Sequence, residues 1–185
     1  MKNGIYVSAP KYARNFDHTA LVSGIARTYS QRGIAVRSEP VLPGGKRADL
    51  AVALDDAWTY IEVKTRTNGT SKRSLSLRQD LLRELLRLSA HSLKQLPRKE
   101  SSLVVLGTSA SPDRRNAITK IALARAFAHK IFDHDSNRVL GMMVFTPFMK
   151  SSTSQKGWRY AFTLIPNPNW KNGVEGLNKL APVQL

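Results

Sequence analysis

The chain contains no cysteine among its 185 residues. This absence excludes disulfide bonds and zinc sites built on thiolates. Long apolar runs are also lacking, because no stretch approaches the roughly 20 residues that span a bilayer. The first residues, MKNGIYVSAPKYARNF, lack the apolar core of a signal peptide. We therefore expect a protein without membrane association that is not secreted and is cytoplasmic, or associated with a nucleoid or a virus.

Acidic residues are scarce. The chain has 13 Asp and Glu residues against 29 Lys and Arg residues, which gives a formal net charge of +16. A field of this sign concentrates polyanions near the surface, so DNA is the expected partner. Hydrophobic residues make up 42% of the chain, which is typical of a globular protein, and the length suits one domain with a sizeable core.

The N-terminal half is expected to alternate between helices and strands. Apolar residues at helical spacing predict a helix over residues 17–32, with Asp17 as a plausible N-cap. A second, leucine-rich helix is predicted over 75–96, closed by Pro97. The predicted strands cover residues 34–40, 48–54, 59–65 and 102–109. The last of these is continuously apolar, which is typical of a strand buried on both faces.

The C-terminal part is expected to add a helix and two strands. Ser111 and Pro112 form a predicted cap and first-turn pair for a helix that runs to about Phe132. Strands follow near 139–145 and 158–165, and residues 166–185 are expected to be an irregular tail. The predicted fold class is therefore α/β, with a central mixed β-sheet flanked by helices and a single domain over residues 1–165.

Three charged residues lie on the predicted strands, where an ionised group is expensive to desolvate. Alternation places Glu62 and Lys64 on one face of the 59–65 strand, while Asp49 shares its face with two alanines. If the two strands form a hairpin, Asp49 and Glu62 converge, and paired carboxylates suit Mg²⁺ or Mn²⁺. The alternative is a structural salt bridge between Lys64 and either acid.

The segments RADL and IEVK, together with the order of elements over residues 17–109, resemble the PD-(D/E)xK nuclease superfamily. Within it, the layout is most similar to small Holliday junction resolvases. The resemblance implies an αβββαβ restriction-endonuclease-like core and a metal-dependent phosphodiesterase. It implies Asp49 and Glu62 as metal ligands and Lys64 as the catalytic lysine. Residues 110–185 lie outside the resemblance.

A further metal ligand is expected, because many relatives supply an acid from the first helix. Here that helix offers only Asp17, beside His18. Glu39, before Pro40, is the better candidate, both as a ligand and as a catalytic residue, although it could equally be a solvated glutamate at a strand end. Val63 is also counted among the metal-ligand candidates. His18 is a weaker candidate, because a lone histidine is more often a surface residue.

Basic residues in loops and at the start of the leucine-rich helix are expected to contact DNA phosphates. Arg78 lies on the sheet-facing arc of that helix, whereas the mixed-charge face with Glu84 is interpreted as solvated surface. The alternative for the loops is plain solvation. The predicted contact residues are Lys46, Arg47, Arg66, Lys72, Arg73, Arg78, Gln79, Lys150 and Lys156.

These features together predict a Mg²⁺-dependent endodeoxyribonuclease, with Mn²⁺ as a substitute, acting on branched or structured DNA. One alternative is a restriction, defence or transposon-end nuclease that is targeted by partner subunits. Another is a nucleic-acid-binding subunit that keeps the fold without cleavage. Symmetric cutting of a junction needs two active sites, so a homodimer is expected, or a subunit of a DNA-processing complex.

Overall fold

The computed structural model describes residues 18–42, 44–54, 57–66, 77–97, 100–132, 139–151, 156–170 and 175–181. Its elements in chain order are α1 (His18–Gln31), β1 (Val36–Ser38), β2 (Leu50–Leu54), β3 (Ala57–Thr65), α2 (Leu77–Gln95), β4 (Ser102–Gly107), α3 (Arg114–Phe132), β5 (Gly141–Ser151), β6 (Lys156–Pro166) and α4 (Glu175–Leu180). The predicted Asp17 cap lies outside the described residues.

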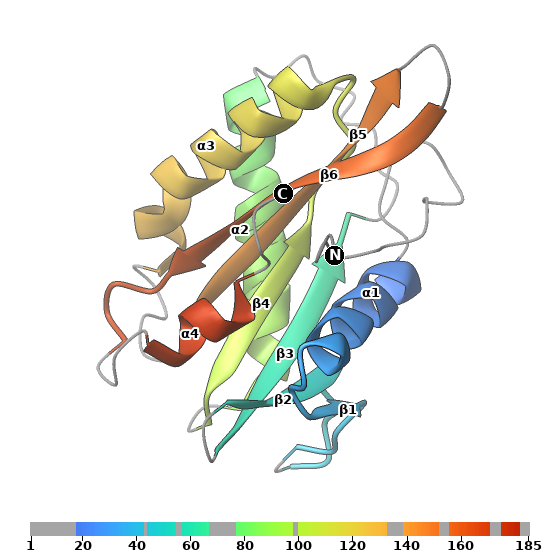
Figure 1. The fold of residues 1–185 in the computed structure, drawn as a ribbon. Coiled ribbons are helices and arrows are strands. Elements are labelled where there is room, and N and C mark those ends of the chain that lie inside the picture. The colour runs from blue at the N-terminus through green and yellow to red at the C-terminus, as the bar shows by residue number, and fades with distance from the viewer. Residues whose placement is uncertain are drawn as a thin grey trace.

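The six strands form one mixed sheet in the order β1-β2-β3-β4-β5-β6 (Figure 1). β1, β2 and β3 pair in antiparallel fashion, β3, β4 and β5 run parallel, and β6 returns antiparallel to β5. Parallel neighbours need long crossover connections. α2 provides the crossover between β3 and β4, and α3 the one between β4 and β5. The predicted α/β class with a mixed central sheet is confirmed.

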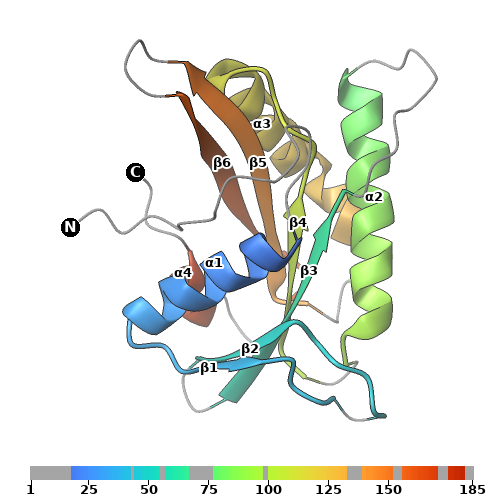
Figure 2. The ribbon, with the colours of Figure 1, turned by 90° about the vertical axis from the view of Figure 1, so that its right-hand side faces the viewer.

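Helices cover both faces of the sheet (Figure 2). One apolar core lies under α1 and α4 and includes Leu21, Ile25 and Leu180. The other lies under α2 and α3 and includes Leu85 and Phe127. β4 is buried along its whole length between these two cores, as its apolar run predicted. Within the described ranges, no helix is long and apolar enough to span a membrane.

The C-terminal segment differs from its prediction, because the part expected to be irregular contains α4. Leu177 and Leu180 of this short helix are buried against α1. The Tyr29 hydroxyl donates a hydrogen bond to the Leu180 carbonyl at 3.0 Å, and Arg32 donates to the Ala181 carbonyl at 3.0 Å. Six residues carry too little periodicity to reveal a helix, so tertiary contacts stabilise what the local pattern could not predict.

Two further predictions need correction. α3 is capped by Asp113, whose Oδ1 accepts the Asn116 N–H at 2.8 Å, whereas Ser111 forms an isolated bridge with Phe148. The hairpin of β5 and β6 is also longer than expected, so Lys150 and Lys156 belong to strands rather than to a loop. The two strands stay paired beyond their apolar stretches, where no alternation of apolar and polar residues predicts a strand.

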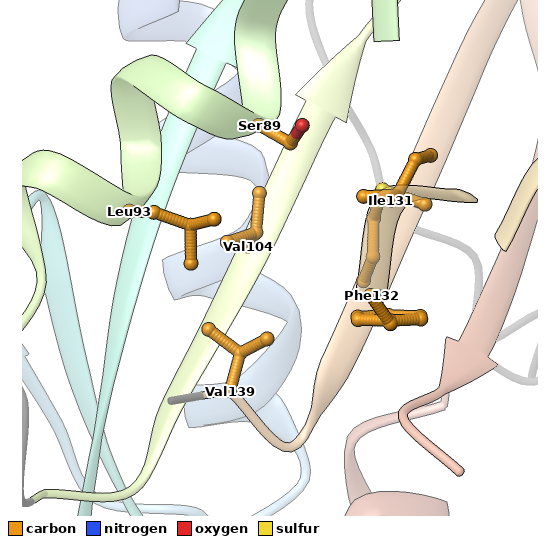
Figure 3. A pocket seen from close by; sticks show the side chains of 7 residues that line it. Ser89, Leu93, Val104, Ile131, Phe132 and Val139 are labelled. Carbon is orange, nitrogen blue, oxygen red and sulfur yellow. The ribbon is translucent and has the colours of Figure 1, made fainter. Parts of the chain in front are cut away.

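A small apolar cavity lies between α2, α3 and the sheet (Figure 3). Its volume is about 10 Å³, which is room for no more than a single water molecule. The cavity therefore belongs to core packing and cannot admit a substrate. The residues that line it are Ser89, Leu93, Val104, Ile131, Phe132, Val139 and Met142.

Candidate active site

Asp49 lies at the start of β2 and reaches the neighbouring strand. The register pairs Leu50 with Ile61, so the next step along the ladder brings Asp49 beside Glu62. The Val63 N–H donates a hydrogen bond to Asp49 Oδ2 at 2.7 Å. The antiparallel pairing of β2 and β3 thus brings Asp49 beside Glu62 and Val63, as the predicted hairpin required.

Glu62 is the most buried charged residue of this region, with a side chain only 2% exposed. Its Oε1 accepts a hydrogen bond from Lys64 Nζ, so the salt bridge that the sequence offered as the structural alternative is present. Its Oε2 is buried and has no hydrogen-bond partner within the described part of the chain. An unsatisfied buried acceptor costs about 1–3 kcal/mol, and a bound cation would remove that cost. Glu62 therefore has the character of a ligand.

His18, the first residue of α1, joins this group. Its Nε2 lies 3.4 Å from Asp49 Oδ1 and 3.1 Å from the Val63 carbonyl oxygen. His18 was the weaker candidate by sequence, because only the packing of α1 beside β3 brings residues 18 and 63 together. The available signal was its position at the helix start, where relatives of the resembled family supply an acid.

The pKa values of these groups follow from burial and hydrogen bonding. Burial raises the pKa of Glu62, and the nearby Asp49 charge adds to this shift, despite the hydrogen bond from Lys64. Burial would also raise the pKa of Asp49, but hydrogen bonds from His18 and the Val63 N–H outweigh it and hold the pKa low. The hydrogen bond with Asp49 raises the pKa of His18 against the effect of burial. Asp49 is thus ionised at neutral pH.

The donor set fits a divalent cation with a few protein ligands. The His18 imidazole contacts both the Asp49 carboxylate and the Val63 carbonyl, and the nearby Glu62 supplies an oxygen, Oε2, that is unpartnered among the described residues. Within the described ranges, no three His, Asp or Glu side chains are arranged closely enough to enclose a metal by themselves. Mg²⁺ and Mn²⁺ accept such partial sets, because Mg²⁺ usually retains several waters.

Glu39 is placed differently from the other candidate ligands. It follows β1 with a φ of 47°, and its side chain is 73% exposed. Its Oε2 lies 3.4 Å from Arg47 Nη1, and only its backbone N–H contacts Asp49, through the carbonyl oxygen at 3.0 Å. The structure therefore does not group Glu39 with the buried carboxylate, and its catalytic and metal roles stay a prediction.

The predicted phosphate contacts differ in their surroundings. Lys46 is exposed and donates to the Lys94 carbonyl at 2.7 Å, near the end of α2. Arg78 is exposed in the first turn of α2, with its guanidinium 5.7 Å from the Phe127 ring centre, and Gln79 is exposed beside it. The residues Lys72 and Arg73 lie outside the described residues, as do the side chains of Lys150 and Lys156.

Glu84 corrects the interpretation of α2, because it is not part of a solvated face. Its side chain is 7% exposed and forms an ion pair with Arg66 at 3.2 Å. It also accepts the Ser109 N–H at 2.9 Å, while the buried Lys120 donates to the Ser109 carbonyl at 2.8 Å. Burial lowers the pKa of Lys120. This polar network ties α2 and α3 to the ends of β3 and β4.

No protein-family model matches the chain, and no curated protein shows a significant match to it.

Proposed function

We propose that this protein is a metal-dependent DNA endonuclease that hydrolyses phosphodiester bonds, with a restriction-endonuclease-like core from α1 to β4. The observation that carries this proposal is Glu62, a buried carboxylate with one oxygen held by Lys64 and the other unpartnered among the described residues. A purely structural carboxylate is normally satisfied on both oxygens. The adjacent Asp49 adds a second ionised ligand at the same strand end.

In this proposal the residues of the site have different roles. Asp49, Glu62 and the Val63 carbonyl would hold Mg²⁺ or Mn²⁺ together with water molecules, and His18 would position Asp49 through its hydrogen bond. A bound divalent cation lowers the pKa of a water molecule and offsets charge on the phosphate. Lys64 lies beside Glu62 with a quarter of its side chain exposed, so its ammonium group can orient a water or bind a phosphate oxygen. Its positive charge is useful where negative charge develops.

The substrate in this proposal is branched or otherwise structured DNA, because the layout resembles small Holliday junction resolvases and the net charge is +16. Cutting such DNA symmetrically would use a homodimer. The alternative is a restriction, defence or transposon-end nuclease whose partner subunits choose the target. A non-cleaving DNA-binding subunit is favoured by one observation: the pairs His18–Asp49 and Lys64–Glu62 already balance much of the charge without a metal.

The test is cleavage of labelled four-way-junction, flap, single-stranded and duplex DNA with Mg²⁺ or with EDTA. We expect Asp49→Asn, Glu62→Gln and Lys64→Ala each to reduce cleavage by about 10²-fold or more, with DNA affinity changed only a few-fold. Glu100→Gln is the matched control, because Glu100 is an exposed acid outside the site. Wild-type activity in any of the three variants, or in EDTA, would overturn the site.

Thermal unfolding gives a second readout that does not depend on turnover. A ligand that binds only the folded state raises the melting temperature with its concentration. We expect Mn²⁺ to raise the melting temperature of the wild type and of Glu100→Gln, but not that of Glu62→Gln. DNA binding without cleavage under every metal condition would leave the non-cleaving subunit as the function.

A further inference from the structure

Beside the candidate active site, two aromatic residues continue the row of side chains on β3. Alternation along the strand places Trp58, Tyr60, Glu62 and Lys64 on the same face of the sheet. Both rings are partly exposed, and Tyr60 packs at one side against the core under α2 and α3. The aromatic row therefore leads directly to the buried carboxylate.

Arg37 of β1 reaches this row from across the sheet. The register places Arg37 opposite Ala51 and Trp58 opposite Ala53, so only small side chains of β2 separate the arginine from the ring. The Arg37 guanidinium lies over the Trp58 ring, 3.9 Å from its centre. Arg37 itself is exposed. The Arg37 cation thus lies over an aromatic ring while its side chain remains accessible from solvent.

The helices on this side of the sheet leave the Arg37 region accessible. α2 packs on β3 and β4, and α3 packs further along on β5 and β6, whereas β1 has its helix contact with α1 on the opposite face. Figure 2 shows α2 and α1 on the two sides of the sheet, with β1 at the edge away from β6. A ligand can therefore approach Arg37 and Trp58 from the edge of the sheet.

We propose that Arg37, Trp58 and Tyr60 form a stacking surface that binds unpaired bases of a DNA strand next to the candidate active site. Aromatic rings and arginine planes are the groups on which single-stranded bases stack without sequence preference. This inference rests on the proposed nuclease function and narrows its substrate to DNA with an unpaired arm, rather than fully paired four-way junctions.

The spacing of the rings favours unpaired bases. Alternate residues of a strand lie about 6.6 Å apart, twice the rise per residue. Successive nucleotides along one strand of B-form DNA are separated by only about 3.4 Å. Two neighbouring bases that contact Trp58 and Tyr60 must therefore be pulled apart, which a paired duplex resists. The phosphate that follows them would lie near Glu62 and Lys64, the next residues of the row.

The experiment measures binding in EDTA by fluorescence anisotropy, which separates binding from cleavage. The probes are a forked duplex with two thymidine arms and a blunt duplex of the same paired length. We expect the wild type to prefer the fork, and Trp58→Ala and Arg37→Ala to weaken fork binding by about 5- to 100-fold, the range for one stacked base. Blunt-duplex affinity should change less than about threefold, and Trp58→Phe should keep most of the preference.

Arg27→Ala is the matched control for charge, because Arg27 is exposed on α1 at the other face of the sheet. It should weaken fork and blunt duplex to the same small extent. If Trp58→Ala fails to fold, Arg37→Ala still tests the stacking surface, because Arg37 is exposed and its replacement should leave the fold intact. A fork with 5-iodouracil in one arm also tests the wild type directly: we expect photocrosslinks at Trp58 or Tyr60, mapped by mass spectrometry.

The outcomes separate this inference from the proposed function. Equal affinity of the wild type for fork and blunt duplex, or equal losses for both ligands in Arg37→Ala, would overturn the stacking surface while leaving a nuclease intact. Crosslinks confined to residues outside the three-residue surface would do the same. Absence of binding to any DNA would overturn both the surface and the nuclease proposal.

Discussion

At the scale of single residues, the candidate site depends on unequal environments for two carboxylates. Asp49 receives hydrogen bonds from His18 and the Val63 N–H, which favour its ionised form. Glu62 has one partner, Lys64, and burial raises its pKa. Groups with oppositely perturbed pKa values in one place are typical of functional sites, although structural ion pairs also produce them.

The His18–Asp49 pair predicts a pH dependence of stability in metal-free protein. The folded pKa of His18 is raised, so its stabilising contribution is complete below the unfolded value of about 6.5 and is lost as pH rises through the folded pKa. The side chain is 42% exposed, so water screens the effect and it should be small. We expect the melting temperature of the wild type, relative to His18→Gln, to fall as the pH rises from about 6.5 through the folded pKa of His18.

The measurement is thermal unfolding in EDTA across that pH range, with His91→Gln as the control, because His91 is an exposed histidine of α2. A difference between wild type and His18→Gln that is constant with pH would show that the pair does not titrate with folding.

At the scale of elements, β3 presents the site and its neighbours hold it in place. The strand is antiparallel to β2 and parallel to β4, so Asp49 approaches from one side and the α2 crossover begins beyond its end. Glu84 of α2 pairs with Arg66, the first residue after β3, and with Ser109 after β4. This network fixes the strand ends that carry the candidate active site.

Removing the Glu84 carboxylate should therefore destabilise the fold. Glu84→Ala removes the carboxylate that pairs with Arg66 and accepts the Ser109 N–H, and we expect a loss of about 2–4 kcal/mol in the free energy of unfolding. The neighbouring Arg83→Ala is the control and should change it by no more than about 0.5 kcal/mol, because Arg83 is exposed. Urea unfolding measures both, and equal small effects would contradict a structural role for the network.

At the scale of the whole molecule, the charge of +16 favours a polyanionic partner, such as the DNA of the proposed function. Exposed cations are distributed over several elements, among them Arg27, Arg87, Arg114 and Lys130. Contacts of this kind are made to phosphates and carry no sequence information. Affinity should thus depend on ionic strength and on the shape of the DNA more than on its sequence.

Salt titration of DNA binding tests this expectation. Each phosphate neutralised on B-form DNA contributes about −0.9 to the slope of log affinity against log salt. We expect a steep slope, similar affinities for two linear duplexes of unrelated sequence, and tighter binding of branched DNA whatever its arm sequences. Competition at fixed salt is the decisive measurement. If one linear sequence outcompetes branched DNA by orders of magnitude, a restriction-like function replaces the structure-specific one.

Features that depend on local periodicity can be predicted from the order of residues along the chain. Alternation on one strand is enough to place Glu62 and Lys64 on a common face, and a continuous apolar run is enough to predict that β4 is buried on both sides. Which distant residues join them depends on how the strands and helices pack. His18 contacts Val63, which lies 45 positions away in the sequence. Glu84 is buried by residues at the ends of β3 and β4, which the pattern of its own helix does not predict. α4 is stabilised by its contacts with α1. Arg37 lies over Trp58 because β1 pairs with β2 in one register. Such contacts depend on strand order and helix packing, which cannot be read from the spacing of residues along the chain.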